Sequence, residues 1–147
     1  MSLQTAIVGV HLLFEQSGQV LLQLRAPSAP FAPHTWHVPA GHRERESSVA
    51  CAVRESTEEL GVSVDPQDLR LVHVLDHFDA GSAAPRMQLF FRVLAYRGTP
   101  KVCEPDRHTR VAWHPYASLP SPLVDYTAVA LTAIAAGRPY TDMGWGA

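Results

Sequence analysis

Two stretches of the sequence, residues 47–60 and 123–136, are each predicted to form a helix that ends at a glycine, Gly61 or Gly137. Glycine is common after a helix because it adopts the left-handed backbone conformation without the steric cost of a side chain. The apolar runs before and between these stretches are short and rich in β-forming residues, which is typical of strands. The resulting order, β-β-β-α-β-β-β-α, predicts an α/β fold in which both helices pack on a mixed β-sheet.

Turn signals separate the strand-forming runs into pairs. Residues 6–14 and 19–25 flank the turn signal EQSG and are predicted to form a hairpin. Residues 69–79 and 86–96 flank the sequence AGSAAP, which suits a hairpin or a wider connection. The remaining predictions are short extended segments at 36–42 and 109–115, a proline-rich surface loop at 26–35 and a turn-rich tail at 138–147.

The composition limits the classes of function. The chain of 147 residues has the common size of one domain, so 1–147 is predicted to be a single domain. The net charge is −2 and no long basic stretch is present, which argues against nucleic acid as a partner. No apolar run approaches the length of a membrane span, and no segment indicates a signal peptide. Two cysteines, Cys51 and Cys103, are too few for a disulfide framework and favour a reducing, cytoplasmic setting.

Three glutamates, Glu55, Glu58 and Glu59, share one face of the helix predicted at 47–60, because residues three and four apart lie side by side. Like charges at these spacings destabilise an isolated helix by roughly 0.2–0.5 kcal/mol per pair. A solvated charged face is the common explanation, and a metal site is the alternative. Arg54 is expected to project about 100° away from Glu55 around the helix axis.

Features upstream of this helix favour the metal site. Glu46 precedes Arg54 by eight residues and can pair with it. The sequence VPAGH at 38–42 predicts a tight turn that brings a backbone carbonyl near the helix. Carboxylates and carbonyls are the oxygen ligands that Mg²⁺ prefers, and Mg²⁺ completes its coordination with waters and substrate phosphates.

The segment Gly41–Val62 resembles the Nudix box of the Nudix (MutT-like) hydrolases. The family pattern is a glycine, five residues, a glutamate, seven residues and then Arg-Glu-U-x-Glu-Glu-x-Gly-U, where U is a bulky aliphatic residue. The part that follows Glu46 has the family's spacing throughout, and a pattern of this length is specific. The sequence WHVPAGH, the EPD loop at 104–106, Trp113 and the closing GRPY and GW also look like one branch of bacterial Nudix proteins.

Two positions depart from the family pattern. Only four residues separate Gly41 from Glu46. We interpret this as a one-residue deletion in the loop, and the alternative is that Ala40 stands in the place of the first glycine. Ser56 replaces the aliphatic residue, and its hydroxyl weakens packing unless it bonds to a carbonyl one turn earlier. Neither change removes a carboxylate.

The resemblance implies an α/β/α sandwich, with a mixed β-sheet flanked by helices. It implies an enzyme that hydrolyses a diphosphate linkage by water attack at phosphorus. The implied substrate is a small nucleotide, either a nucleoside diphosphate linked to another group or a nucleoside triphosphate. Arg25 and Arg86 are candidates to bind its phosphates. Trp36 is a candidate to stack on its base, although core packing is the more common fate of such a tryptophan.

The resemblance also implies the ligands of the metal, which is Mg²⁺ or Mn²⁺. Glu46 is expected to hold Arg54, which in turn orients the helix carboxylates. The residue that takes a proton from water stays open among three candidates, of which Glu104 lies outside the helix. The implied ligands are the side chains of Glu55, Glu58 and Glu59 and the carbonyl of Ala40. The candidate bases are Glu59, Glu55 and Glu104.

Several alternatives stay open. The shortened loop and Ser56 are compatible with a catalytically weak Nudix-like module that binds a nucleotide or a protein. His34, His37 and His42 lie near the predicted site, but no fourth ligand accompanies them as zinc requires. Guanine-selective relatives that act on oxidised nucleotides often carry an asparagine in the stretch before the final helix. This chain has Pro122 near that place, and proline offers no amide to read a base edge, which argues against an oxidised-GTP role. Nudix domains often dimerise, so a homodimer is a further alternative.

Overall fold

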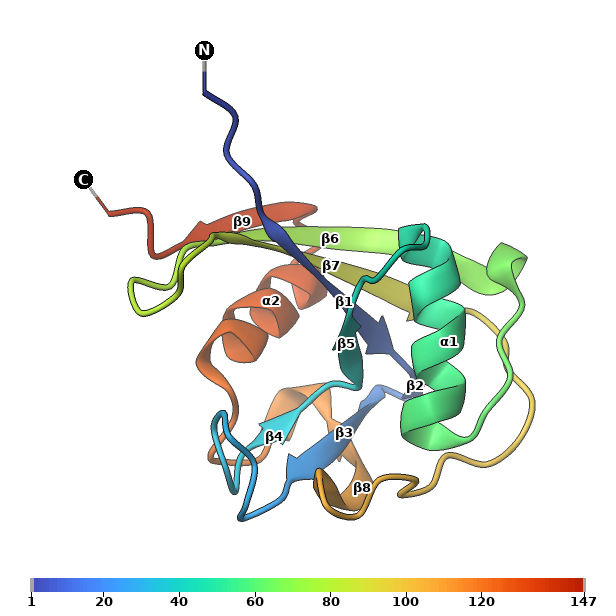
Figure 1. The fold of residues 1–147 in the computed structure, drawn as a ribbon. Helices are drawn as coiled ribbons and strands as arrows, with labels where there is room; N and C mark the ends of the chain where they lie inside the picture. The colour runs from blue at the N-terminus through green and yellow to red at the C-terminus, as the bar shows by residue number, and fades with distance from the viewer. Residues whose placement is uncertain (1, 147) are drawn as a thin grey trace.

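A computed structural model of the chain describes residues 2–146. Figure 1 shows a large sheet with one helix on each side and a smaller sheet below it. Two short 3₁₀ turns, η1 (Pro66–Asp68) and η2 (Tyr116–Ser118), accompany the helices α1 (Ser48–Leu60) and α2 (Asp125–Ala135). The strands are β1 (Ile7–Leu13), β2 (Glu15–Gln16), β3 (Gln19–Arg25), β4 (Trp36–His37), β5 (Ala40–His42), β6 (Leu69–His77), β7 (Arg86–Val93), β8 (His108–Pro115) and β9 (Tyr140–Met143).

The large sheet is mixed, as predicted, with the strand order β5-β1-β7-β6-β9. β1 runs parallel to β7 and antiparallel to β5. β6 and β7, the two runs around AGSAAP, form an antiparallel pair joined by the segment 78–85, which is the wider of the two connections that the sequence left open. α1 and α2 cover opposite faces of this sheet, which gives the predicted α/β/α arrangement.

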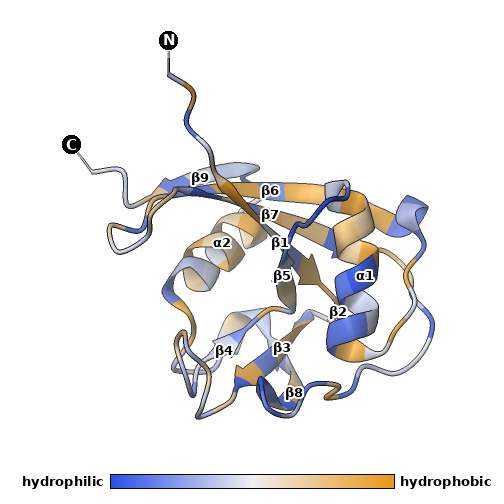
Figure 2. Cartoon of the chain, in the orientation of Figure 1, coloured by the Kyte–Doolittle hydropathy of each residue, from blue (hydrophilic) through white to orange (hydrophobic). Residues whose placement is uncertain are grey.

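The two faces of β1 belong to two separate hydrophobic clusters. Val10, Leu12 and Phe14 pack in the cluster that includes buried residues of α1, whereas Leu13 packs in the cluster that includes α2. This alternation follows from the period of two in a strand. Figure 2 shows hydrophobic colours along β1 and β6 and blue residues on the middle turns of α1. β1 is therefore the centre of the core, and α1 offers a polar side to its surroundings.

β1 does not form the predicted hairpin with β3. The hairpin partner of β3 is β2, through a two-residue turn at Ser17 and Gly18, whose φ angles of 48° and 74° suit a tight hairpin turn. β1 instead pairs with β5 and β7, because a strand that is apolar on both faces needs cover on both. β3 belongs to a second sheet with β2, β4 and β8, whereas one mixed sheet was predicted.

The predicted helix at 47–60 is confirmed within one residue as α1. Ser47 caps its N-terminus, where its side chain accepts a hydrogen bond from the Ala50 amide at 3.1 Å. Gly61 ends it with φ of 70°, in the left-handed conformation. The fully buried Ser56 hydroxyl donates to the Ala52 carbonyl at 2.8 Å, which is the backbone bond that this departure from the family pattern requires.

The tail is more ordered than predicted, because it contains β9, which pairs parallel with β6 at the edge of the large sheet. The buried ring of His73 holds it there, since its two nitrogens lie 2.7 Å from the Arg138 carbonyl and 2.8 Å from the Thr141 hydroxyl. These contacts join distant parts of the chain, so no local pattern signals them. Within residues 2–146, no helix has the length and apolar character that a membrane crossing requires.

Candidate active site

Two of the three glutamates on α1 point into the protein. Glu55 is 7% exposed and Glu59 is 4% exposed, whereas the side chain of Glu58 is 53% exposed. The alternative of a fully solvated charged face is therefore wrong. A buried carboxylate is unfavourable in its ionised form unless a partner compensates its charge, so the partners of each glutamate decide what this face can do.

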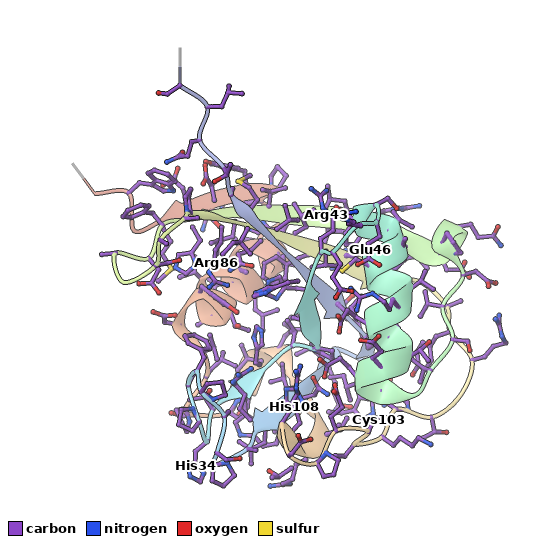
Figure 3. All side chains as sticks on the ribbon, viewed as in Figure 1. His34, Arg43, Glu46, Arg86, Cys103 and His108 are labelled. Atoms are coloured by element: carbon purple, nitrogen blue, oxygen red, sulfur yellow. The ribbon has the colours of Figure 1, made fainter. Side chains whose placement is uncertain are left out.

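Arg54 joins the first half of this face into one network. Its Nε donates to the Glu46 carboxylate at 2.9 Å, and Figure 3 shows Glu46 beside the first turns of α1. One terminal nitrogen donates to Glu55 at 2.8 Å and to Glu58 at 3.1 Å. The predicted projection away from Glu55 is wrong for the guanidinium, because the long side chain bends back over the helix. The contact with Glu58 was missed, although the spacing of four residues signals it.

The pKa values of the glutamates at the two ends of this site are shifted in opposite directions. The hydrogen bonds from Arg54 hold the pKa of Glu46 down at about 2. Burial, together with the charges of Glu55 and Glu104, raises the pKa of Glu59 to about 7. Burial also raises the pKa of Glu55, against the opposing effect of Arg54. Glu104 is therefore close enough to act on both buried carboxyls, as its loop position in the sequence suggested.

Gly41 in β5 leaves the space that Glu55 occupies. A Cβ atom at this position would lie 2.1 Å from the Glu55 carboxyl, far inside contact distance. The absence of a side chain therefore lets the carboxylate reach the backbone of β5. Ala40, whose carbonyl is a predicted ligand, is the neighbouring residue on β5, and both residues line the same cavity as Glu59.

Glu59 is contacted by two residues of the second sheet that were not predicted. The Gln23 side-chain amide on β3 lies 3.4 Å from Glu59 Oε2, and His108 Nδ1 on β8 lies 3.3 Å from the same oxygen. Burial and the nearby charges of Arg25 and Arg107 lower the pKa of His108 to about 4, so its ring is neutral at pH 7. A glutamine inside the apolar run QVLLQLR was the sequence signal for one of these contacts.

The donor set suits a hard divalent cation, although its members do not converge in this arrangement. Within the described chain, no three acidic, histidine or cysteine side chains meet closely enough to hold a metal. Arg54 keeps Glu58 on the outer side of α1, away from the buried Glu59. Burial and the charges of two nearby acids nevertheless raise the pKa of Glu59. A bound cation would offset this repulsion between like charges. Carboxylate and carbonyl oxygens are ligands for Mg²⁺ or Mn²⁺.

The histidines near the predicted site do not form a zinc centre. His34 lies on the exposed loop between β3 and β4, at the bottom of the view in Figure 3 and away from the labelled Glu46. His42 lies 3.1 Å from a terminal nitrogen of Arg86. His37 is buried, and its Nδ1 lies 2.6 Å from the Thr127 hydroxyl. Each ring therefore has separate neighbours.

A cavity of about 730 Å³ opens beside Glu59. Arg25 and Arg86, the predicted phosphate-binding residues, both line it. Trp36 does not line it, because its ring is 7% exposed in the core and contacts His114 edge-on at 4.6 Å. The core role is therefore the one that the structure gives to Trp36. The size of the cavity suits a small-molecule ligand.

The loop between β3 and β4 forms one wall of this cavity, with Phe31 among its lining residues. Its two ends are tied together, since the Arg25 amide donates to the Thr35 carbonyl at 2.8 Å and the His34 amide donates to the Arg25 carbonyl at 3.1 Å. Arg25 Nε also donates to the Phe31 carbonyl at 2.7 Å. The wall and the cationic side chain are therefore held by the same contacts.

The inner part of the cavity is polar but uncharged, and of its residues only His37 was expected near the site. His11 Nε2 lies 2.7 Å from Gln88 Oε1, and the His11 ring stacks on Phe90 at 4.5 Å. Burial lowers the pKa of His11 to about 4 and lowers the pKa of His37, so both rings are neutral at pH 7. Tyr126 also lines this part. The histidine of β1 lay inside an apolar run, which was the available signal.

Comparisons with known proteins agree with this fold. The NUDIX domain family matches residues 3–133 of the chain. The crystal structure of a MutT NUDIX hydrolase from Burkholderia pseudomallei is 32% identical and superposes with a TM-score of 0.77, covering 88% of this chain and 98% of that one. No curated protein matches the chain.

Two further structures support the fold alone. The crystal structure of a MutT protein from Methanosarcina mazei Go1 is 20% identical with a TM-score of 0.76, covering 92% of this chain and 97% of that one. The solution structure of the E. coli ORF135 protein is 23% identical with a TM-score of 0.69, covering 92% and 95%. The family match extends over most of the sequence and includes the helix that carries the three glutamates, so this chain belongs to the Nudix hydrolase family.

Proposed function

We propose that this chain hydrolyses a diphosphate linkage in a small nucleotide and depends on Mg²⁺ or Mn²⁺ for this reaction. The observation that carries the proposal is the pair of buried carboxylates, Glu55 and Glu59, beside a cavity that also presents Arg25 and Arg86. Acidic groups that bind cations and basic groups that bind phosphates are both needed to hold a metal nucleotide.

Glu55, Glu58, Glu59 and the carbonyl of Ala40 would hold the cation. When bound, it neutralises phosphate charge and lowers the pKa of the attacking water. Arg54 draws Glu58 toward the outer side of α1, at 3.1 Å. We therefore expect Glu58 to rotate away from Arg54 when it serves as a ligand, while Glu46 keeps the guanidinium in place.

Glu59 is the proton acceptor that we favour, because it lines the cavity and its Oε1 forms no hydrogen bond within the described residues. Its pKa is raised to about 7 in the metal-free protein. A bound cation would lower it, so the carboxylate oxygen that the cation leaves free would take the proton. Glu55 is engaged by Arg54 at 2.8 Å, which ties it to an orienting role. Glu104 acts on Glu59 through its charge in this arrangement. Its side chain is 34% exposed in a loop.

The phosphates of the substrate would lie between the carboxylates and the arginines at the cavity wall. Arg25 is half-buried and fixed by its bond to the Phe31 carbonyl, so it presents its charge from a defined position. Arg86 presents a second guanidinium from β7 (Figure 3). Two arginines at one cavity match the charge of a diphosphate better than that of a single carboxylate.

A phosphate-release screen tests this proposal. The purified chain is assayed with Mg²⁺ and with Mn²⁺ on nucleoside triphosphates, nucleotide sugars, ADP-ribose, dinucleoside polyphosphates and NADH, at neutral and alkaline pH. We expect turnover of at least one class, abolished by Glu58→Gln and by Glu59→Gln and retained by Asp142→Asn on the distant edge strand β9. Ligand binding without product formation, for every class and both metals, would show a binding module instead.

A further inference from the structure

The two oxygens of the Glu59 carboxylate have different surroundings. Oε2 lies 3.4 Å from the Gln23 side-chain nitrogen and 3.3 Å from His108 Nδ1. Within residues 2–146, no hydrogen bond uses Oε1. Oε1 is also not one of the fully buried atoms that lack a partner, so it keeps some exposure. Because Glu59 lines the cavity, Oε1 is the oxygen that remains for a ligand there.

Gln23 reaches Glu59 in two ways. Its side-chain nitrogen lies 3.4 Å from Oε2 and 3.5 Å from the backbone carbonyl of Glu59, in the last turn of α1. Carbonyls in the last turn of a helix lack partners within the helix. One amide from β3 therefore contacts both the end of the helix and the carboxylate that the helix carries. Two acceptors on this side support the assignment of the amide nitrogen rather than its oxygen.

Gln23 is poorly placed for a purely structural role. Its side chain is 1% exposed, and its Oε1 has no hydrogen-bond partner within the described residues. A buried acceptor without a partner destabilises the folded state. An apolar residue of similar length on β3 would remove this cost, but it would also remove the amide that contacts Glu59. The clearest gain from the glutamine is therefore its contact with the carboxylate.

We propose that Gln23 is a positioning residue for the hydrolysis, which holds Oε2 of Glu59 so that Oε1 faces the cavity. His108 on β8 contacts the same oxygen. This inference rests on the proposed function, because the value of a fixed Glu59 lies in its use as a ligand and proton acceptor. Residues that orient a ligand without touching the metal commonly change affinity or activity by about 10–100-fold when they are replaced.

The test replaces Gln23 by methionine, which keeps the length of the side chain and removes its polar atoms. We expect kcat to fall by about tenfold, with KM nearly unchanged because Gln23 does not line the cavity. Calorimetric titration of Mn²⁺ into the protein without substrate should show a weaker affinity, again by about tenfold. The midpoint of thermal unfolding of the metal-free protein should change by only a few degrees, because the removal of the unpartnered Oε1 offsets the loss of the two long contacts to Glu59.

Gln19→Met is the matched control, since Gln19 is the first residue of the same strand and does not line the cavity. We expect it to keep both kcat and Mn²⁺ affinity. Gln23→Leu repeats the test if Gln23→Met does not fold. A Gln23 variant that folds with unchanged kcat and Mn²⁺ affinity would overturn the inference. So would a loss of kcat that only matches the fraction of unfolded protein at the assay temperature, or failure of both variants to fold, because each shows a structural role.

The inference and the proposed function fail in different ways. If the wild-type chain hydrolyses no nucleotide, the proposed function fails, and the ratio of Mn²⁺ affinities still decides whether Gln23 positions Glu59. If the wild-type chain is active and Gln23→Met equals it, only the inference about Gln23 fails.

Discussion

Two carboxylates of the candidate site, Glu46 just before α1 and Glu59 in its last turn, have opposite electrostatic surroundings. At the first turns, Glu46 receives two hydrogen bonds from Arg54, and its pKa is held at about 2. At the last turn, Glu59 is buried beside Glu55 and Glu104, and its pKa is raised to about 7. The first carboxylate has a cation supplied by the protein. The side chains in contact with the second are a neutral amide and a neutral imidazole, and Arg107 acts on it only from farther away.

This difference suits Glu46 to a structural role and Glu59 to a reactive one. A paired carboxylate is stable and fixed, and it can orient its neighbours. A buried carboxylate without a cation is a source of instability, and groups with such raised pKa values gather at functional sites. The protein therefore accepts an unfavourable charge at the end of α1 that faces the cavity, and it compensates the charge at the other end itself.

Glu59→Gln should have the largest effect, with activity and stability moving in opposite directions. A carboxyl whose folded pKa is raised from 4.5 to about 7 contributes its stability below pH 4.5 and loses it as pH rises through 7. The substitution should raise the free energy of unfolding of the metal-free protein at pH 8 by about 1–3 kcal/mol, and leave it unchanged at pH 4. We expect kcat to fall by about 10²–10⁴-fold.

Urea unfolding at the two pH values measures the first effect, and steady-state kinetics measures the second. Glu58→Gln is the matched control, because its half-exposed side chain carries no comparable burial penalty. It should lose activity without gaining stability at pH 8. Equal stability of Glu59→Gln and wild type at pH 8 would contradict the contrast between the two ends of α1.

Gly41→Ala should disturb the carboxylate that lies between the two ends. The new methyl group would meet the Glu55 carboxyl at 2.1 Å, so this side chain must move away from β5. We expect kcat to fall by about 10–100-fold and stability to fall by about 1–3 kcal/mol. Kinetics and urea unfolding measure both, with Gly146→Ala as the control because nothing lies near its added Cβ.

Retained activity in Gly41→Ala would show that the position of Glu55 is not critical. A loss of stability without a change in kcat would indicate a packing role for Gly41 alone.

Glu46→Gln should have a smaller effect on activity, because Arg54 keeps its bonds to Glu55 and Glu58. A carboxyl with a lowered pKa contributes stability above pH 4.5, and this contribution is lost as pH falls through 2. The variant should therefore unfold at a lower temperature than wild type at pH 7, and the gap should close toward pH 2. We expect kcat to fall by about tenfold.

Circular dichroism melts across this pH range measure the gap. Glu44→Gln is the control, since its side chain is 71% exposed and 3.3 Å from Arg54. A gap that widens as pH falls would refute the assigned role of the Glu46–Arg54 pair.

Glu104→Gln should have the smallest effect if Glu104 acts only through its charge. Its negative charge raises the pKa of Glu59, so the substitution should lower that pKa and raise the stability of the metal-free protein at pH 8 by less than Glu59→Gln does. Thermal melts between pH 6 and 9 measure this shift, and kcat should change by only a few-fold. A loss of activity as large as that of Glu59→Gln would instead make Glu104 the proton acceptor.

The local parts of the fold were predictable from the sequence. The ends of α1 follow from Ser47 and Gly61, and β3 has the predicted bounds 19–25. Strand partners were less predictable, because β1 and β3 look like a hairpin locally, yet β1 is drawn between α1 and α2 by burial on both faces. β9 had no apolar pattern of its own, since it is an edge strand held by the distant His73.

The candidate site divides in the same way. The family pattern placed the glutamates on one helix and Glu46 near Arg54, because both depend on spacing along the chain. It did not indicate which glutamates are buried, because burial depends on Gly41 and on Gln23 in other strands. Residues that act from across the two sheets are set by packing, which spacing in a single sequence does not encode.

The cavity wall between β3 and β4 has a consequence for how such a protein changes over generations. This loop is tied at its base by backbone bonds between Arg25 and its neighbours Thr35 and His34, and it shares no helix turn with the glutamates of α1. Insertions or replacements beyond its base alter the room beside the cavity while the reactive carboxylates stay in place. We therefore expect changes in this loop to alter which molecule fits the cavity more than they alter the carboxylates of α1.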